Sequence, residues 1–152
     1  MTKRVLWIAS SSLLFLSGIA SAQSVRPGLV KALSDVKFEG DDSKCLRYAT
    51  ESGDPDTGPS TAILKAAPKC DVPWHFHTAE EELMVVRGSV VTEMEGMPAA
   101  TLDAGGFAMM SSKVKHRFSC QSKEECIMFV SFDRKYDIFW VKDSPRPDHP
   151  VK

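Results

Sequence analysis

Residues 74–88 read WHFHTAEEELMVVRG and contain two of the four histidines of the chain. Side chains at positions i and i+2 of a β-strand point to the same face, so His75 and His77 project side by side while Phe76 points away. Two imidazoles directed at one point are typical of a metal site. The next three residues can turn the chain, which brings Glu81 to the two histidines from the following strand as an oxygen ligand. A shift of one residue in that turn would present Glu82 instead.

The rest of the chain has the pattern of an all-β protein. From residue 36 onward, short runs of β-branched and aromatic residues alternate with turn residues every eight to twelve positions. The predicted strands are 45–50, 61–67, 82–86, 89–94, 107–110, 116–120, 126–132 and 138–141. The Gly- and Pro-rich loop at 52–59 and the bend at 103–106 separate them. Only residues 27–33 are predicted to form a short helix.

Two segments together resemble the sequence motifs of the cupin family. The pattern His-x-His, three residues, Glu, six residues, Gly is filled by His75, His77, Glu81 and Gly88. The second motif, Gly, five residues, Pro-x-Gly-x-x-His, is similar to GGFAMMSSKVKH at residues 105–116. That segment keeps the bend, the spacing and the histidine, but has Ser-Ser-Lys in place of Pro-x-Gly.

The resemblance covers roughly residues 46–141 and implies a double-stranded β-helix, the jelly-roll barrel of cupins, as a single domain. It also implies that His116 is the fourth ligand, beside His75, His77 and Glu81. Three imidazoles and one carboxylate suit one divalent transition metal, namely Fe, Mn, Ni, Zn or Cu, and leave one or two coordination positions open.

Three further side chains are candidates to line the pocket around the metal. Phe118 shares a face with His116 by strand alternation. Met109 is expected in the apolar wall or the core. Trp74, next to the first ligand, either shields the mouth of the barrel or packs outside the sheet.

The beginning of the chain resembles a secretory signal. Residues 1–22 have a basic start, an apolar run and a small-residue ending, although an uncleaved membrane anchor is the alternative. We therefore expect a signal peptide at 1–22, an N-terminal extension at 23–44, the barrel at 45–142 and a flexible tail at 143–152. The mature chain would have no membrane span and would be periplasmic or secreted.

All four cysteines lie after the predicted signal, and an even number in an oxidising compartment favours disulfides. Cys120 and Cys126 flank a polar stretch that can turn a hairpin, so we expect them to pair, which leaves Cys45 for Cys70. The alternative is that they are small core residues or metal thiolates, but no pair has the Cys-x-x-Cys spacing of a zinc site.

The fold and the metal site do not define a reaction, because cupin-type barrels host enzymes and binding proteins alike. The leading hypothesis is a dioxygenase-like metalloenzyme acting on a small molecule, with isomerase or lyase chemistry as variants. The alternative is a periplasmic protein that binds or senses a metal or ligand without turnover. The formal net charge of −1, with interspersed charges, does not indicate a nucleic-acid partner. The resemblance also suggests a homodimer.

Overall fold

The computed structural model describes residues 27–40 and 45–142. The predicted signal at 1–22 and tail at 143–152 lie outside these residues. Contacts divide the chain into two units, Met1–Lys31 and Ala32–Lys152, and the ten strands of the described residues lie in the second. In the described part of the first unit, residues 27–31, there is neither helix nor strand.

The prediction of a short helix at residues 27–33 is wrong. Among the described residues of this region, 27–40, there is one 3₁₀ turn, η1 (Leu33–Asp35), which begins where the predicted helix ends. The predicted segment is too short to form a stable helix without packing partners, and Gly28 disfavours the helical conformation further.

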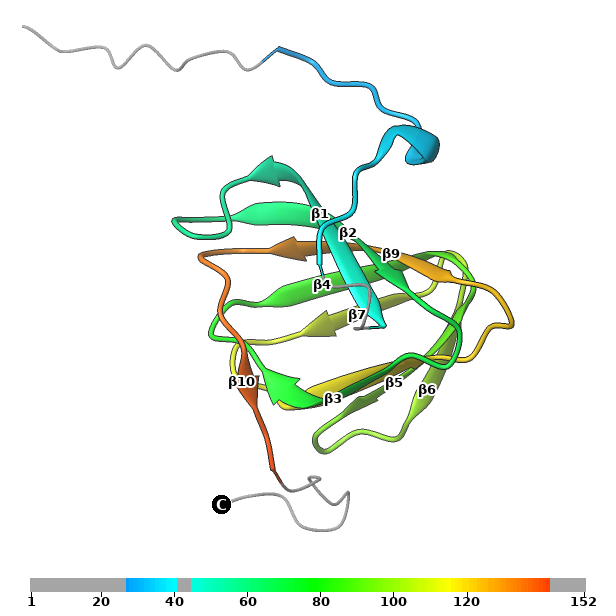
Figure 1. Ribbon diagram of the computed structural model, residues 1–152. Helices are drawn as coiled ribbons and strands as arrows, with labels where there is room; N and C mark the ends of the chain where they lie inside the picture. Colours follow the sequence, from blue (N-terminus) through cyan, green and yellow to red (C-terminus); the bar gives the residue numbers. More distant parts are fainter. Residues whose placement is uncertain (1–26, 41–44, 143–152) are drawn as a thin grey trace, which may run out of the picture. The chain divides into compact units, whose positions relative to one another are not determined.

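Ten strands form two five-stranded antiparallel sheets (Figure 1). The first sheet contains, in spatial order, β1 (Leu46–Gly53), β2 (Ser60–Ala66), β9 (Cys126–Phe132), β4 (Glu81–Arg87) and β7 (Phe107–Met110). The second contains β10 (Phe139–Trp140), β3 (Asp71–Phe76), β8 (His116–Cys120), β5 (Ser89–Met94) and β6 (Ala100–Asp103). This is the double-stranded β-helix, and the all-β prediction is confirmed. Two strands are absent from the predicted ranges. Strand β3 was assumed only around His75 and His77, without bounds, and β6 was missed because its four residues lack the run of β-branched side chains that marks the others.

The chain changes sheets three times at the same end of the barrel, namely from β3 to β4, from β7 to β8 and from β9 to β10. Strand β3 belongs to the second sheet and β4 to the first, so the short loop at residues 77–80 crosses between the sheets. The connection from β9 to β10 crosses back in the opposite direction, as the orange segment of Figure 1 shows. Residues from both sheets therefore meet at this end.

The core lies between the two sheets and follows strand alternation. In β8, His116, Phe118 and Cys120 are buried, whereas the residues between them are only partly so. The remaining buried apolar side chains come from both sheets, and include Ala66, Val72, Leu83, Val85, Val90, Met110, Met128 and Val130. A side chain such as Leu83 contributes about 1.5–3 kcal/mol to stability when it is buried in this way.

Two disulfide bonds cross-link the barrel. Cys45 is joined to Cys70, and Cys120 to Cys126. The hairpin expected between Cys120 and Cys126 is wrong, because the connection from β8 to β9 passes from the second sheet to the first. Both pairs are compatible with an oxidising compartment. Within residues 27–40 and 45–142, no helix has the length and apolar character needed to cross a membrane.

Candidate metal centre

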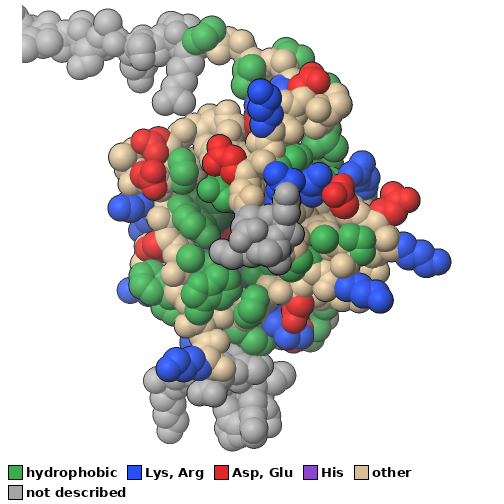
Figure 2. All heavy atoms as spheres, in the orientation of Figure 1, with side chains coloured by type: hydrophobic (Ala, Val, Ile, Leu, Met, Phe, Trp, Pro, Cys, Tyr) green, Lys and Arg blue, Asp and Glu red, His purple; other side chains and the backbone are tan. Residues whose placement is uncertain are grey.

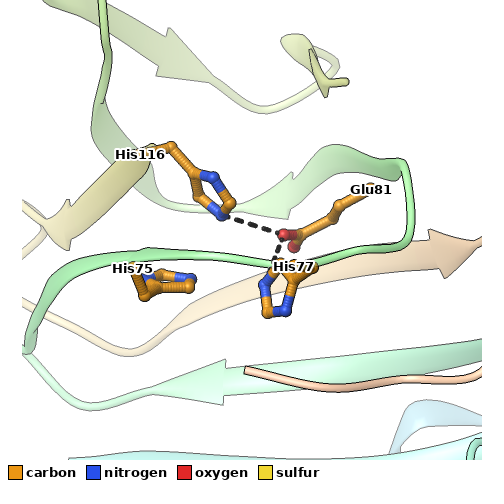
Figure 3. A group of neighbouring side chains, drawn as sticks. All are labelled: His75, His77, Glu81 and His116. Atoms are coloured by element: carbon orange, nitrogen blue, oxygen red, sulfur yellow. Dashed lines mark hydrogen bonds and ion pairs between the residues drawn. The ribbon is translucent and has the colours of Figure 1, made fainter. Parts of the chain in front are cut away.

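Four side chains converge at the end of the barrel where the chain changes sheets (Figure 3). They are His75 near the end of β3, His77 directly after it, Glu81 at the start of β4 and His116 at the start of β8. One ligand atom of each lies within 4.8 Å of the others, and the four residues are only 3–4% exposed. The structure thus brings together all four side chains predicted as ligands.

Strand pairing explains how residues distant in sequence meet. His75 and His116 are direct cross-strand partners in β3 and β8, so their side chains point into the barrel side by side. Glu81 begins a strand of the opposite sheet and reaches the histidines across the barrel, rather than from a neighbouring strand of the same sheet. Its neighbour Glu82 faces outward and accepts a hydrogen bond from Ser131, so Glu81 is the inward-facing carboxylate.

Each of the three imidazoles is oriented by a main-chain carbonyl. Nδ1 of His75 contacts the Pro73 oxygen at 2.7 Å, and Nδ1 of His116 contacts the Val114 oxygen at 2.9 Å. Nδ1 of His77 contacts the carbonyl oxygen of Asp137. A carbonyl oxygen only accepts, so each Nδ1 carries the proton, and Nε2 is the atom directed at the centre of the cluster.

The carboxylate of Glu81 lies at the centre of this group. Its Oε2 is 3.1 Å from Nε2 of His116 and 3.2 Å from Nε2 of His77 (Figure 3). Burial on its own raises the pKa of Glu81, but hydrogen bonds from His116 and His77 outweigh it and lower that pKa to about 2. Glu81 is therefore ionised at neutral pH although it is buried.

The histidines differ in their affinity for protons. Burial, reinforced by the nearby His116, lowers the pKa of His75 to about 4, so His75 is neutral at neutral pH. For His77 burial also acts to lower the pKa, but the hydrogen bond to Glu81 and its negative charge outweigh it, and the pKa is raised. A proton or a metal cation between Nε2 of His77 and Oε2 of Glu81 is thus stabilised by the carboxylate.

The donor set fits a divalent transition metal. Three Nε2 lone pairs and a carboxylate oxygen repel one another at these separations unless a proton or a cation lies between them. Imidazole and carboxylate donors are the ligands that iron, manganese, nickel, zinc and copper share, and the histidines have the outer hydrogen bonds usual for metal-ligating imidazoles. His75, His77, Glu81 and His116 are therefore the residues that could hold such an ion.

Two residues near the centre were not found from the sequence. The carboxylate of Asp137 accepts hydrogen bonds from both the backbone N–H and the hydroxyl of Thr78, and its carbonyl orients His77. The ring of Tyr136 lies 5.2 Å from that of His77. Burial, with the nearby carboxylates of Glu81 and Asp137, raises the pKa of Tyr136 to about 12. These contacts span about 60 residues of sequence, and no local pattern indicates them.

The turn before His116 keeps its geometry without the Pro-x-Gly of the cupin motif. Lys113 stands at the glycine position of that motif and adopts a φ of 66°, a left-handed conformation that is unfavourable for lysine. The N–H of Val114 donates to the Ser111 oxygen at 3.0 Å, which closes the turn. Lys113 N–H donates to the carbonyl of His77, and Ser112 Oγ to that of Thr78.

Only one of the three predicted pocket-lining residues faces the barrel interior. Phe118 is buried on the same face as His116. The ring of Trp74 instead lies 5.9 Å from the guanidinium of Arg117, away from the ligands, so of the two alternatives for Trp74 the structure has packing outside the sheet. Met109 is exposed, because alternation in β7 directs its neighbours Ala108 and Met110 inward instead.

Solved structures with the same fold are numerous but distant in sequence. The polyketide cyclase RemF from Streptomyces resistomycificus matches with a TM-score of 0.61 at 19% identity, over 78% of this chain and 90% of that one. An RmlC-like cupin from Shewanella frigidimarina matches with a TM-score of 0.59 at 16% identity, over 70% and 91% of the two chains. Identities this low establish the fold alone.

A third structure, reported for the DMSP lyases RdDddP and RnDddQII, matches with a TM-score of 0.59 at 15% identity. The match covers 71% of this chain but 63% of the lyase, which is less than two thirds of it. A search of curated proteins gave no match. Residues 62–132 match the family model for the cupin domain, and this segment includes the three ligand candidates of the first motif together with His116. The chain therefore contains a small cupin domain.

Proposed function

We propose that this protein is an exported metalloenzyme of the cupin type that carries out dioxygenase-like chemistry on a small organic molecule. The main support for a metal site is the orientation of the three imidazoles, each of which is held by a main-chain carbonyl at Nδ1. As a result, Nε2 of His116 and Nε2 of His77 lie 3.1 and 3.2 Å from the same oxygen of Glu81. His75, whose ring is 4.3 Å from that of His116, completes the group.

A divalent ion bound by these residues supplies Lewis acidity toward a substrate oxygen. The protein supplies the remainder of the environment. The ionised Glu81 offsets the positive charge of the ion in a buried setting, and the carbonyls of Pro73, Val114 and Asp137 keep the imidazoles from rotating. Four protein ligands leave one or two positions of a five- or six-coordinate ion for small molecules.

Tyr136 is the side chain we propose as a hydrogen-bond donor to the substrate. Its ring packs against His77, and its hydroxyl keeps its proton at neutral pH because the pKa is raised to about 12. A protonated phenol beside a carboxylate-rich site donates to a substrate oxygen without adding charge. Lyase and isomerase variants of the reaction would use the same group. The solved neighbours include a lyase and a cyclase.

Export is part of the proposal. Two disulfides are compatible with the periplasm or the extracellular space, and the signal-like segment at 1–22 supplies the route. Fractionation of cells that express the full chain tests this directly. Mature protein lacking the first 22 residues and found outside the cytoplasm supports export, whereas full-length protein in the cytoplasm contradicts it.

A second candidate function is a protein that binds or senses a metal or ligand without turnover. The deep burial of all four ligand candidates favours it, since a closed centre suits retention more than exchange. The two functions differ in the coordination sphere. A solvent-exchangeable water on the ion, measured by proton relaxation of manganese-loaded protein, supports the enzyme, and its absence supports the binder.

The test of catalysis is oxygen consumption by metal-loaded protein against a panel of small oxygen-bearing organic molecules. Glu81→Gln removes the ligand charge, whereas Glu82→Gln alters the adjacent outward-facing carboxylate and serves as the matched control. We expect substrate-dependent oxygen uptake or product formation that Glu81→Gln abolishes and Glu82→Gln keeps. Turnover that survives Glu81→Gln would contradict the proposed site.

We also propose a homodimer. On the outer face of the first sheet, Ile63, Phe129, Met84 and Phe107 stand in register across four neighbouring strands, and the last three are exposed. An apolar row on a sheet face is self-complementary about a two-fold axis. Light scattering after size exclusion should give the dimer mass for the wild type and the monomer mass for Met84→Lys. A monomeric wild type refutes the dimer.

A further inference from the structure

Aromatic rings surround the ligand cluster on the side where the chain passes from β9 to β10. Phe132 ends β9, Tyr136 lies in the connection and Trp140 lies in β10. The ring centroids of Phe132 and Tyr136 are 5.3 and 5.2 Å from that of His77, and that of Trp140 is 5.4 Å from that of His75. Two of the four ligand candidates are therefore in direct contact with aromatic side chains.

The opposite end of the barrel is filled. The disulfide between Cys120 and Cys126 lies there with both residues fully buried, beside Val85 and Val90, which are also fully buried. At the aromatic end, by contrast, Tyr136 is 37% exposed and Trp140 is 58% exposed. Figure 2 shows hydrophobic side chains gathered on the side of the molecule where the β9–β10 connection runs in Figure 1. These partly exposed rings therefore lie between solvent and the histidines that they contact.

We infer that the site takes a planar aromatic substrate that carries an oxygen donor; this inference rests on the proposed function. The ring of such a substrate packs against Trp140 and Tyr136 while its oxygen points toward the ligand cluster. Aromatic pairs with centroids 4.5–7 Å apart are favourable beyond the burial of their surface. The side chains beside His75 and His77 thus offer flat, apolar surfaces next to the candidate metal ligands.

Trp140 contributes little to the packing of the barrel, because more than half of it is exposed. Its ring lies 5.4 Å from that of His75, which places it to contact a molecule bound at the ligand cluster. Phe139, its neighbour in β10, supplies an internal comparison. Its ring is stacked on that of Phe76, with a centroid distance of 5.0 Å and an interplanar angle of 13°. Phe139 therefore packs against Phe76 and not against a ligand histidine.

The experiment compares two chelating probes on the full protein loaded with Co²⁺, with the cobalt content measured first. One probe, 4-nitrocatechol, is aromatic and the other, acetohydroxamate, is aliphatic, and both bind metals through two oxygens. Trp140→Leu should weaken nitrocatechol binding roughly three- to tenfold and leave hydroxamate binding unchanged. Phe139→Leu should change neither. Trp140→Phe keeps a ring at this position and should retain most of the nitrocatechol binding, so the test does not depend on one variant.

The outcomes separate the inference from the proposed function. Cobalt retained in all variants, with Trp140→Leu weakening both probes equally or neither probe, overturns the aromatic substrate alone. A wild type that binds no cobalt overturns the proposed function and this inference with it. Equal losses for Phe139→Leu and Trp140→Leu with nitrocatechol would also refute a role specific to the rings beside the ligands.

Discussion

Lys113 donates its main-chain N–H to the carbonyl oxygen of His77 over 2.8 Å. This bond joins the turn before His116 to the loop that carries a second ligand candidate. The turn holds Lys113 in a left-handed conformation where the cupin motif has glycine. The structure thus retains the geometry of the motif at the expense of local backbone strain.

Lys113→Gly should therefore stabilise the protein. Relief of the left-handed conformation is worth about 1 kcal/mol in the free energy of unfolding. Urea denaturation of the wild type, Lys113→Gly and Lys113→Ala measures it. Alanine keeps the strain because it has a Cβ, so it should give no gain. If glycine gives no gain over alanine, the left-handed turn is not a source of strain.

Asp137→Ala should weaken metal binding without removing a ligand. The carboxylate fixes Thr78 through two hydrogen bonds, and the neighbouring carbonyl orients His77. Loss of such an outer partner reduces metal affinity by roughly 10- to 100-fold. Competition with a chromophoric chelator measures the affinity. Asp137→Asn keeps an oxygen acceptor for the Thr78 N–H and should therefore retain part of the lost metal affinity. Equal metal affinity in the wild type and both variants would refute a positioning role for Asp137.

Metal retention should fall as the pH is lowered. Because Glu81 raises the pKa of His77, a proton competes with the metal for Nε2 of His77 below that raised pKa. Affinity should then fall about tenfold per pH unit, and more steeply below about 4, where His75 also takes up a proton. Dialysis at a series of pH values followed by metal analysis gives the profile. Retention that does not change between pH 8 and 4 would contradict it.

The two disulfides should contribute unequally to stability. Cys45–Cys70 closes a loop with a separation of 25 residues, whereas Cys120–Cys126 closes one of 6. Loop-closure entropy predicts a cost of about 3.5 kcal/mol for removing the first and about 2 kcal/mol for the second. Thermal unfolding of the two paired Cys→Ala variants compares them. A larger loss from the short-loop pair would mean that core packing of Cys120 and Cys126, both fully buried, dominates.

Local spacing in the sequence predicts three of the four ligand candidates. His75, His77 and Glu81 lie within seven residues of one another, and alternation alone directs both histidines inward. His116 required the family resemblance, since its partner His75 lies on a strand 41 residues earlier. The register of two strands is set by the whole sheet and cannot be read from either strand alone.

The surroundings of the centre were not predictable in the same way. Asp137 and Tyr136 reach His77 only because the β9–β10 connection returns to the sheet that contains β3. The sequence leaves two orientations open for Trp74, because a residue beside a ligand can face either side of the sheet when the strand is irregular. The pairing of β3 with β8 is indeed shifted between Val72 and His75, and this shift is invisible in the sequence.

The most direct test of the metal centre is elemental analysis of protein purified after export, together with Glu81→Ala, His77→Ala and the outward-facing control Glu82→Ala. About one transition metal per chain should be present in the wild type and in Glu82→Ala, and should be lost in the other two. A wild type without metal, or metal kept in both ligand variants, would contradict the four-residue site.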